Sequence, residues 1–169
     1  SLGRDMVAAE LGMNSYVGEL ARQLDLDAPK ISVVVPNYNY ARHLAQRLGS
    51  IIAQSLTPYE IIFLDDASTD ESIATARQIL ENARVNWRII ENSENSGDVF
   101  TQWRKGVEIA SGDLVWIAEA DDWADTHFLQ TTVAAIERPE VVMSFSESKQ
   151  VNERGEETAA SYYDYVSDI

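Results

Sequence analysis

The chain has 169 residues, enough to bury a substantial core as one domain, and its 28 acidic residues against 13 Lys and Arg give a net charge of -15. This charge disfavours nucleic-acid backbones and anionic membranes as partners, so a phosphate-bearing ligand must be held locally, by a metal ion or by backbone amides. The absence of cysteine excludes disulfides and thiolate metal sites, and the two histidines argue against a multi-histidine zinc site.

Residues 1–29 carry apolar side chains at helical spacing, at Met13, Val17, Leu20 and Leu24. They predict an amphipathic helix that is a connector from an upstream domain or a surface strap. The chain starts at Ser1 and stops at Ile169 after an acidic, Tyr-rich tail without a turn residue. We therefore expect a segment of a longer protein that has other domains.

The sequence predicts no transmembrane segment, because no apolar run reaches the roughly 18 residues that span a bilayer. The start also lacks the basic and apolar layout of a signal peptide. We expect a cytoplasmic protein, which other domains or partners could bring to the inner face of the membrane.

The first strand is expected at Ile31–Val35, a β-branched run, and is expected to stop at Pro36 because proline has no amide proton. Residues 37–40 have turn chemistry. A helix follows, with apolar positions at Leu44, Leu48, Ile51 and Ile52. A second buried strand, 61–64, ends at Asp65 and Asp66.

The middle of the chain continues the alternation of strands and helices. Ser68 and Glu71 predict a capping box for a helix that carries Ile73, Ile79 and Leu80. A third strand is expected at 87–90. It is followed by a polar loop and by a helix whose inward side chains are expected to be Phe100, Trp103, Val107 and Ala110.

The most informative stretch is the apolar run Leu114–Ala118 followed by Glu119, Asp121 and Asp122. The run predicts a strand buried on both faces, with the acids at its carboxyl end. Two carboxylates about 6 Å apart repel by roughly 3 kcal/mol at an effective dielectric near 20, which favours protonation or a bound cation such as Mg²⁺ or Mn²⁺. The alternative is a solvated acidic turn before the next helix.

A further helix over 128–136, a last strand at 141–145 and a polar hairpin-like segment at 149–157 complete the pattern. Strands alternating with helices predict an α/β fold, a doubly wound, mainly parallel sheet with helices on both faces, as in Rossmann-like domains. The carboxyl ends of parallel strands meet at one edge, so Pro36–Asn39, Asp65–Asp66 and the acids at 119–122 should lie together. This constellation suggests a nucleotide-diphosphate ligand.

These motifs resemble, in order, those of the family 2 glycosyltransferases of the GT-A fold. The resemblance rests on 31–39, on 64–70 and on Gly112–Asp113 with 119–122, and it covers residues 30 to about 150. It implies that residues 30–169 are a nucleotide-sugar-binding domain, truncated in its C-terminal acceptor half, of an enzyme of bacterial polysaccharide biosynthesis. The catalytic base would then lie beyond Ile169, and the catalytic residues stay unknown.

The resemblance also assigns roles to single residues. Asp66 would bond uracil, and the nucleoside would be lined by Pro36, Asn37, Tyr38 and Asn39, with Asp65 beside it. Asp121 would face the ribose or the metal, Asp122 would ligate Mn²⁺ or Mg²⁺, and Glu119 would be a third acid at the metal. The plainer alternatives are a helix-capping turn for the aspartate pair and turn chemistry for the two asparagines.

Two places in the chain depart from the family pattern. Ala67 stands where glycine is usual, a mild change if its φ is negative. Trp103–Arg104 replaces a common Arg-Asn pair, which weakens any phosphate contact there.

The function expected from this reading is metal-dependent, inverting transfer of a sugar from a nucleotide-diphosphate donor, a UDP-sugar, to a glycan or lipid-linked hydroxyl acceptor. One alternative is a donor-binding or catalytically incomplete module. Another is a sugar nucleotidyltransferase, although Pro36–Asn39 is not a Gly-rich basic phosphate loop. A receiver-type signalling domain would need its acid pair after the first strand rather than the second.

Overall fold

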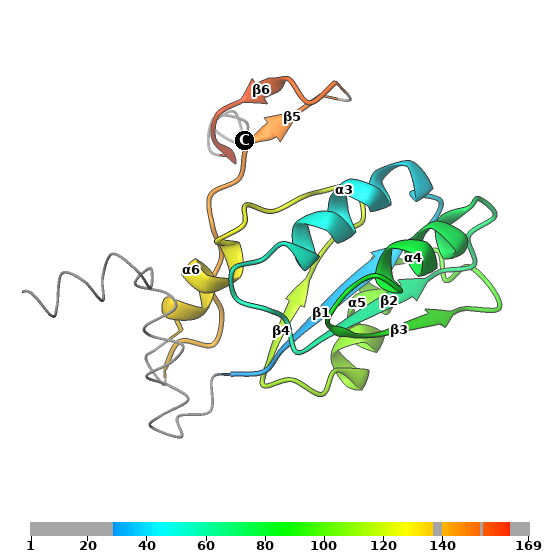
Figure 1. Ribbon diagram of the computed structural model, residues 1–169, viewed down its shortest axis with the longest axis horizontal. Coiled ribbons are helices and arrows are strands. Elements are labelled where there is room, and N and C mark those ends of the chain that lie inside the picture. The colour runs from blue at the N-terminus through cyan, green and yellow to red at the C-terminus, as the bar shows by residue number, and fades with distance from the viewer. Residues whose placement is uncertain (1–28, 137–139, 153, 163–169) are drawn as a thin grey trace, which may run out of the picture.

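The computed structural model describes residues 29–136, 140–152 and 154–162 (Figure 1). The expected N-terminal helix lies outside these residues. None of the described helices combines the length and the apolar composition that a bilayer-spanning segment requires.

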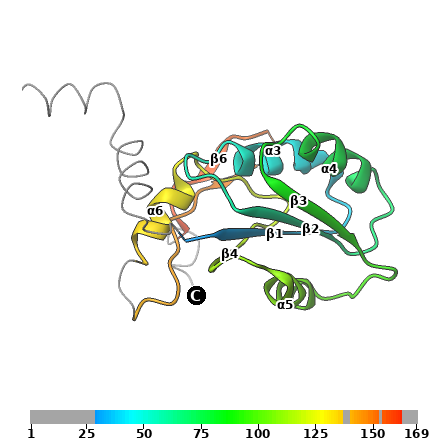
Figure 2. The same cartoon turned by 60° about the horizontal axis from the view of Figure 1, so that its bottom comes forward.

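A parallel sheet with strand order β3-β2-β1-β4 forms the centre of the fold. Its strands are β1 Ile31–Asn37, β2 Glu60–Asp65, β3 Asn86–Glu91 and β4 Leu114–Ile117. Helices α3 (Ala41–Ile52) and α4 (Ser72–Leu80) cover one face, and α5 (Val99–Ile109) covers the other (Figure 2). The predicted α/β architecture with helices on both faces is confirmed.

The two central strands, β1 and β2, are buried along their whole length. On one face, Val33, Val35, Ile61 and Phe63 pack in a core that also contains side chains of α3 and α4. On the other face, Val34, Ile62 and Leu64 pack together with Ile109 and Ala110. Both faces of these strands are therefore apolar, which explains their unbroken runs of apolar residues.

The expectation that Pro36 ends the first strand is wrong, because Pro36 lies inside β1 and pairs with Leu64. Along β1 the Val34 carbonyl accepts from Ala118, on the side of β4, and the Asn37 carbonyl accepts from Asp66, on the side of β2. Alternation places Pro36 on the β4 side, where β4 has already ended at Ile117. Its missing amide proton therefore costs no ladder hydrogen bond.

The last expected strand, 141–145, is also wrong, since these residues form no ladder. Val142, Met143 and Phe145 are 93%, 73% and 78% exposed, so the apolar composition of this segment is not matched by burial. After α6 (Phe128–Ala134), the chain instead forms a small antiparallel hairpin of β5 (Gln150–Val151) and β6 (Glu157–Ala159). Within the described residues, β4 therefore stays at the edge of the main sheet.

Helix α5 faces the sheet with a different side from the one predicted. Gln102 and Gly106 are buried, whereas Phe100 and Val107 are 65% and 52% exposed. The cause is the close approach of the helix to β1, because a methyl group on Gly106 would overlap the side chain of Val34. Apolar periodicity alone does not reveal that a glycine lies in the contact.

We expect Gly106→Ala to lower the free energy of unfolding by about 1 to 3 kcal/mol, because overpacking against Val34 outweighs the helix propensity gained. Gly49→Ala, in the interior of α3, is the matched control. No atom lies near the position of its new methyl group, and that variant should be more stable by about 1 kcal/mol. Urea denaturation measures both, and a stabilised Gly106→Ala would contradict the close packing of α5.

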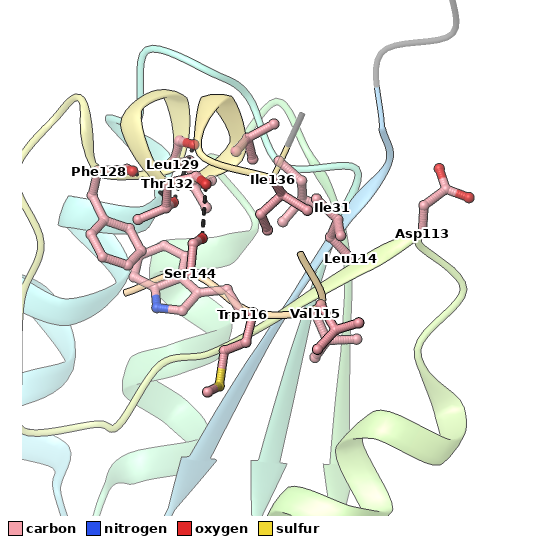
Figure 3. A pocket seen from close by; sticks show the side chains of 13 residues that line it. Ile31, Asp113, Leu114, Val115, Trp116, Phe128, Leu129, Thr132, Ile136 and Ser144 are labelled. Atoms are coloured by element: carbon pink, nitrogen blue, oxygen red, sulfur yellow. Dashed lines mark hydrogen bonds between the residues drawn. The ribbon is translucent and has the colours of Figure 1, made fainter. Parts of the chain in front are cut away.

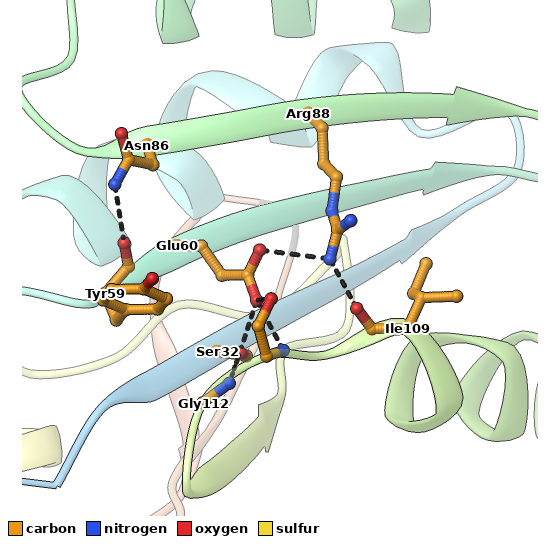
Figure 4. Close-up of polar contacts among 8 residues, drawn as sticks. Ser32, Tyr59, Glu60, Asn86, Arg88, Ile109 and Gly112 are labelled. Atoms are coloured by element: carbon orange, nitrogen blue, oxygen red, sulfur yellow. Dashed lines mark hydrogen bonds and ion pairs between the residues drawn. The ribbon is translucent and has the colours of Figure 1, made fainter.

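A buried carboxylate joins three strands at the amino end of the sheet (Figure 4). Glu60 Oε1 accepts from Ser32 Oγ at 2.7 Å and from both the amide and the hydroxyl of Ser111, while Oε2 pairs with Arg88 at 3.1 Å. Burial alone would raise the pKa of Glu60, but these hydrogen bonds and the charge of Arg88 outweigh it and hold the pKa below its usual value.

This lowered pKa predicts a contribution to stability that is present above the unfolded pKa, about 4.3, and is lost as the pH falls through the lower folded value. At pH 7 we expect Glu60→Gln to be less stable by about 2 kcal/mol. The difference from the parent should shrink below about pH 4. Denaturation at pH 7 and in acid checks this, with the exposed Glu108→Gln as control. A difference that does not change with pH would refute the ionic role.

Candidate functional site

The expected gathering of loops at the carboxyl edge of the sheet is present. The register pairs Asn37 with Asp65 directly, and β4 delivers residues 118–122 to the same edge. A cleft of about 640 Å³ opens there. It is lined by Pro36, Asn37, Tyr38, Tyr40, Asp66, Asn95, Gly97, Asp98, Val99, Gln102, Glu119 and Asp121.

Six of the residues predicted from sequence line this cleft, whereas Asn39, Asp65 and Asp122 are not among its lining. Asp65 accepts from Asn37 Nδ2 at 2.8 Å and from the Ser68 amide at 2.8 Å, so its carboxylate joins two loops. The plain turn role considered for Asp65 therefore has direct structural support.

Asn39 holds the same two loops together from the exposed side. Its backbone has a φ of 60°, a conformation that asparagine tolerates well, and its Oδ1 accepts from the amide of Thr69 at 2.8 Å. Its own amide donates to Ser68 Oγ at 2.9 Å. Ser68 therefore bonds the loop of Asn39 and does not cap α4; the first amide of that helix, Ser72, donates to Asp70 instead, so the predicted capping box is wrong.

Ala67 has a φ of 61°, so the negative φ that would make the loss of glycine mild is not present. Left-handed backbone costs a residue with a side chain roughly 1 to 2 kcal/mol. The loop keeps this conformation because the two residues before Ala67 are both held by hydrogen bonds, Asp65 by the Ser68 amide and Asp66 by the Ser96 amide.

Asp66 is 6% exposed and binds the loop that follows β3. Its carboxylate accepts from Asn92 Nδ2 at 2.6 Å, from Gln102 Nε2 at 2.8 Å, and from the amide and hydroxyl of Ser96 at 3.0 and 2.8 Å. A carboxylate has about four acceptor sites, so these donors fill it. Asp66 thus fixes the wall of the cleft formed by residues 95–98.

The acidic residues after β4 point to different partners. Glu119 accepts from the indole of Trp103, which belongs to the Trp103–Arg104 pair that departs from the family pattern. Asp121 lines the cleft beside Tyr40, and its charge is the main cause that raises the pKa of the Tyr40 hydroxyl. Asp122 lies outside the lining, where the positive charge of Arg47 acts on it.

Burial is the main cause that raises the pKa values of Glu119 and Asp122. The charge of Asp121 adds to the increase in both cases, and the charge of Arg47 opposes it. These carboxylates therefore repel one another, as the sequence predicts, and a cation would relieve that repulsion.

The donor set fits only one kind of metal site. Among the described residues, no group of three His, Cys, Asp or Glu side chains is placed so that it could hold a metal ion by itself. Glu119 is also engaged by Trp103. The arrangement suits a hard divalent ion held by one or two carboxylates and completed by oxygens of a bound diphosphate, the usual pattern for Mg²⁺.

Sequence analysis missed one wall of the cleft, formed by Asn95, Gly97, Asp98, Val99 and Gln102. A signal for it existed, because the loop follows β3, and β3 ends at the same edge as its neighbours. Tyr40 was assigned to the turn alone. Its place at the start of α3, directly after residues 37–39, is what brings it to Asp121.

A second cavity, of about 310 Å³, lies between β4, α6 and residues 142–144 (Figure 3). Trp116 and Phe128 stack there with ring centroids 4.7 Å apart, and Ser144 Oγ donates to the Thr132 carbonyl at 2.8 Å. Among the described residues that line it, Asp113 alone is charged. This cavity lacks the acids and loops that a nucleotide would need.

Comparisons with known proteins give the family and the fold that this chain resembles. The family described as Glycosyl transferase family 2 matches residues 32–163. An uncharacterized glycosyltransferase from Nostoc sp. is 36% identical over 114 residues, which are 67% of this chain and 34% of that protein. A structure of S. aureus TarS 1-349 in complex with UDP has a TM-score of 0.58 at 27% identity, over 64% of this chain and 32% of that one.

A mannosyltransferase from Pyrobaculum calidifontis, solved in complex with GDP-Man and Mn²⁺, has a TM-score of 0.61 at 24% identity. The match covers 81% of this chain and 44% of that one, and it shows the likeness of the fold alone. The chain spans only 34% of the length of the Nostoc relative and 32% of the TarS structure.

Proposed function

Because this chain belongs to glycosyl transferase family 2, whose model covers residues 32–163, we propose that it binds a nucleotide-diphosphate sugar and serves its transfer to a hydroxyl acceptor. The GT-A fold expected from sequence agrees with the solved structures that the chain resembles. The donor is a UDP-sugar in this proposal, the acceptor is a glycan or a lipid-linked hydroxyl, and the transfer inverts the anomeric carbon.

The observation that carries the proposal is the distribution of groups in the 640 Å³ cleft. The loops of Asn37, Tyr38 and Asp66 form one part of its wall and offer polar groups and an aromatic ring to a nucleoside. Glu119 and Asp121 form another part, where a diphosphate with a cation would relieve the repulsion between acids. Separate nucleoside and diphosphate regions match the two ends of one ligand.

A divalent metal would be held by Asp121, with Asp122 and Glu119 close enough in sequence to contribute. When bound, such an ion supplies positive charge that neutralises the leaving nucleoside diphosphate. Because the chain carries a net charge of -15, it has little other positive charge to offer a diphosphate. Tyr38 and Tyr40, which are 44% and 37% exposed, give the cleft an apolar rim that could exclude water from the ligand.

Calorimetry tests the proposal directly, with UDP-, GDP- and dTDP-sugars titrated in the presence of Mn²⁺ and then of a chelator. We expect a UDP-sugar to bind most tightly and the affinity to fall without the metal. Among related donors that share one sugar, the comparison isolates the base. Failure of every nucleotide sugar to bind, with or without Mn²⁺, would overturn the proposal.

A further inference from the structure

One face of α3 and the turn after it carries polar side chains that bond the backbone of residues 119–129, which we call the acidic segment. The side chains are those of Arg47, Ser50 and Gln54, spaced three and four positions apart, and we call them the anchor stripe. Such spacing places them along a single side of a helix. Arg47 is 3% and Gln54 is 5% exposed, so these two side chains are buried although polar, and Ser50 between them is half-buried.

Arg47 binds the start of the acidic segment. Its Nε donates to the Glu119 carbonyl at 2.5 Å, and its guanidinium lies over the ring of Trp116, 5.4 Å from the centroid. The remaining Nη1 is buried without a partner. A buried arginine in this state is costly, and an apolar side chain would fill the same space in the core more cheaply.

Gln54 binds the end of the same segment from both of its amide atoms. Its Nε2 donates to the Asp125 carbonyl at 2.6 Å, and its Oε1 accepts from the Leu129 amide at 2.9 Å. Ser50 Oγ accepts from the Ala124 amide at 3.3 Å, between the contacts at Glu119 and Asp125 along the chain. The stripe therefore contacts the backbone of the segment at its beginning, middle and end.

These contacts matter because the sheet cannot hold the segment. The pairing of β4 with β1 ends at Ile117, and the Ala118 amide makes the last bond to β1. By contrast, residues 37–40, the loop that we propose to line the nucleoside, lead directly into α3, whose first residue is Ala41. One helix thus fixes both the loop that ends at Tyr40 and the acids that begin at Glu119.

We propose that the anchor stripe positions Glu119–Asp122 in the cleft, so that α3 sets the distance between the nucleoside region and the metal and diphosphate region. Arg47, Ser50 and Gln54 are positioning residues in this proposal and touch no ligand. The link to ligand binding rests on the proposed function, whereas the hold on the backbone does not.

Hydrogen exchange of the ligand-free protein tests the hold on the backbone. In Arg47→Met and Gln54→Met we expect faster exchange at the amides of Ala124 and Leu129, by up to about tenfold, with no change in β1 and β2. Arg47→Lys, which keeps the charge but not the planar fork, should behave like Arg47→Met. Gln46→Met, exposed on the same helix, is the control. Unchanged exchange at residues 119–129 in both methionine variants would overturn the proposal.

Titration with UDP and with uridine tests the consequence for the ligand. In Arg47→Met and Gln54→Met, displacement of the acids should weaken metal-dependent UDP binding by roughly 10- to 100-fold, the loss seen when a group that orients a metal ligand is removed. Uridine binding should stay unchanged, because uridine has no diphosphate. Faster exchange with unaltered UDP affinity would refute the positioning role. If the parent protein binds no UDP, the proposed function fails and the link to the ligand falls with it, while the exchange result still decides whether the stripe holds the segment.

Discussion

Asp121→Asn is expected to lower the affinity for UDP in the presence of Mn²⁺ by roughly 10- to 100-fold, the loss typical of a weakened metal site. The carboxylate lies in the lining of the cleft, and an amide oxygen is a weaker ligand for a hard cation. With a chelator in place of Mn²⁺, the same substitution should have little effect. Calorimetry on both proteins in both conditions gives the four affinities needed.

Asp122→Asn is the matched comparison, because it makes the same chemical change one residue away. The family resemblance gives Asp122 the role of metal ligand. In the structure, however, Asp121 lines the cleft, whereas Asp122 lies outside the lining, where the charge of Arg47 acts on it. We therefore expect the smaller loss at Asp122. A larger loss at Asp122 would favour the role taken from the family, and equal UDP affinity with Mn²⁺ and with a chelator would rule out a metal at either residue.

The edge of the sheet at which the site lies could be predicted because its cause is local. Short apolar runs end in acids or asparagine, and parallel strands place those ends together whatever the details of packing. The pairing of Asn37 with Asp65 in the register of β1 and β2 confirms that these strand ends lie side by side. The family was also recognisable, because its motifs occur in order along the chain.

The details that failed depend on contacts between distant segments. The burial of Gln102 requires knowing that Gly106 lies against Val34, and the tolerance of Pro36 requires knowing where β4 ends. Arg47 on the face of α3 also looks like an ordinary exposed residue until the Glu119 carbonyl is placed beside it. Periodicity and propensity carry no information about such neighbours.

Asp66→Ala is expected to lower the free energy of unfolding by about 3 kcal/mol, because it leaves buried donors without an acceptor. Asn92, Gln102 and Ser96 all donate to this carboxylate, and Gln102 is 3% exposed, so water cannot readily replace the lost partner there. Asp98→Ala is a control in the same loop, since the exposed side chain of Asp98 caps α5, and we expect it to cost less than Asp66→Ala.

Asp66→Ala should also reduce the preference for UDP over CDP. We attribute this preference to Asp66 and to the loop that it holds. Because four donors already fill the Asp66 carboxylate, its effect on the base is exerted through the loop that it holds. Uracil presents an imide N–H where cytosine presents an acceptor, so an acceptor on that loop favours UDP, and the preference falls when the loop is displaced. Both affinities are measured well below the melting temperature of Asp66→Ala, with circular dichroism to verify the fold. A variant that is as stable as the parent and discriminates as well would show that the four donors find other partners, and that the carboxylate of Asp66 neither holds the cleft wall nor selects the base.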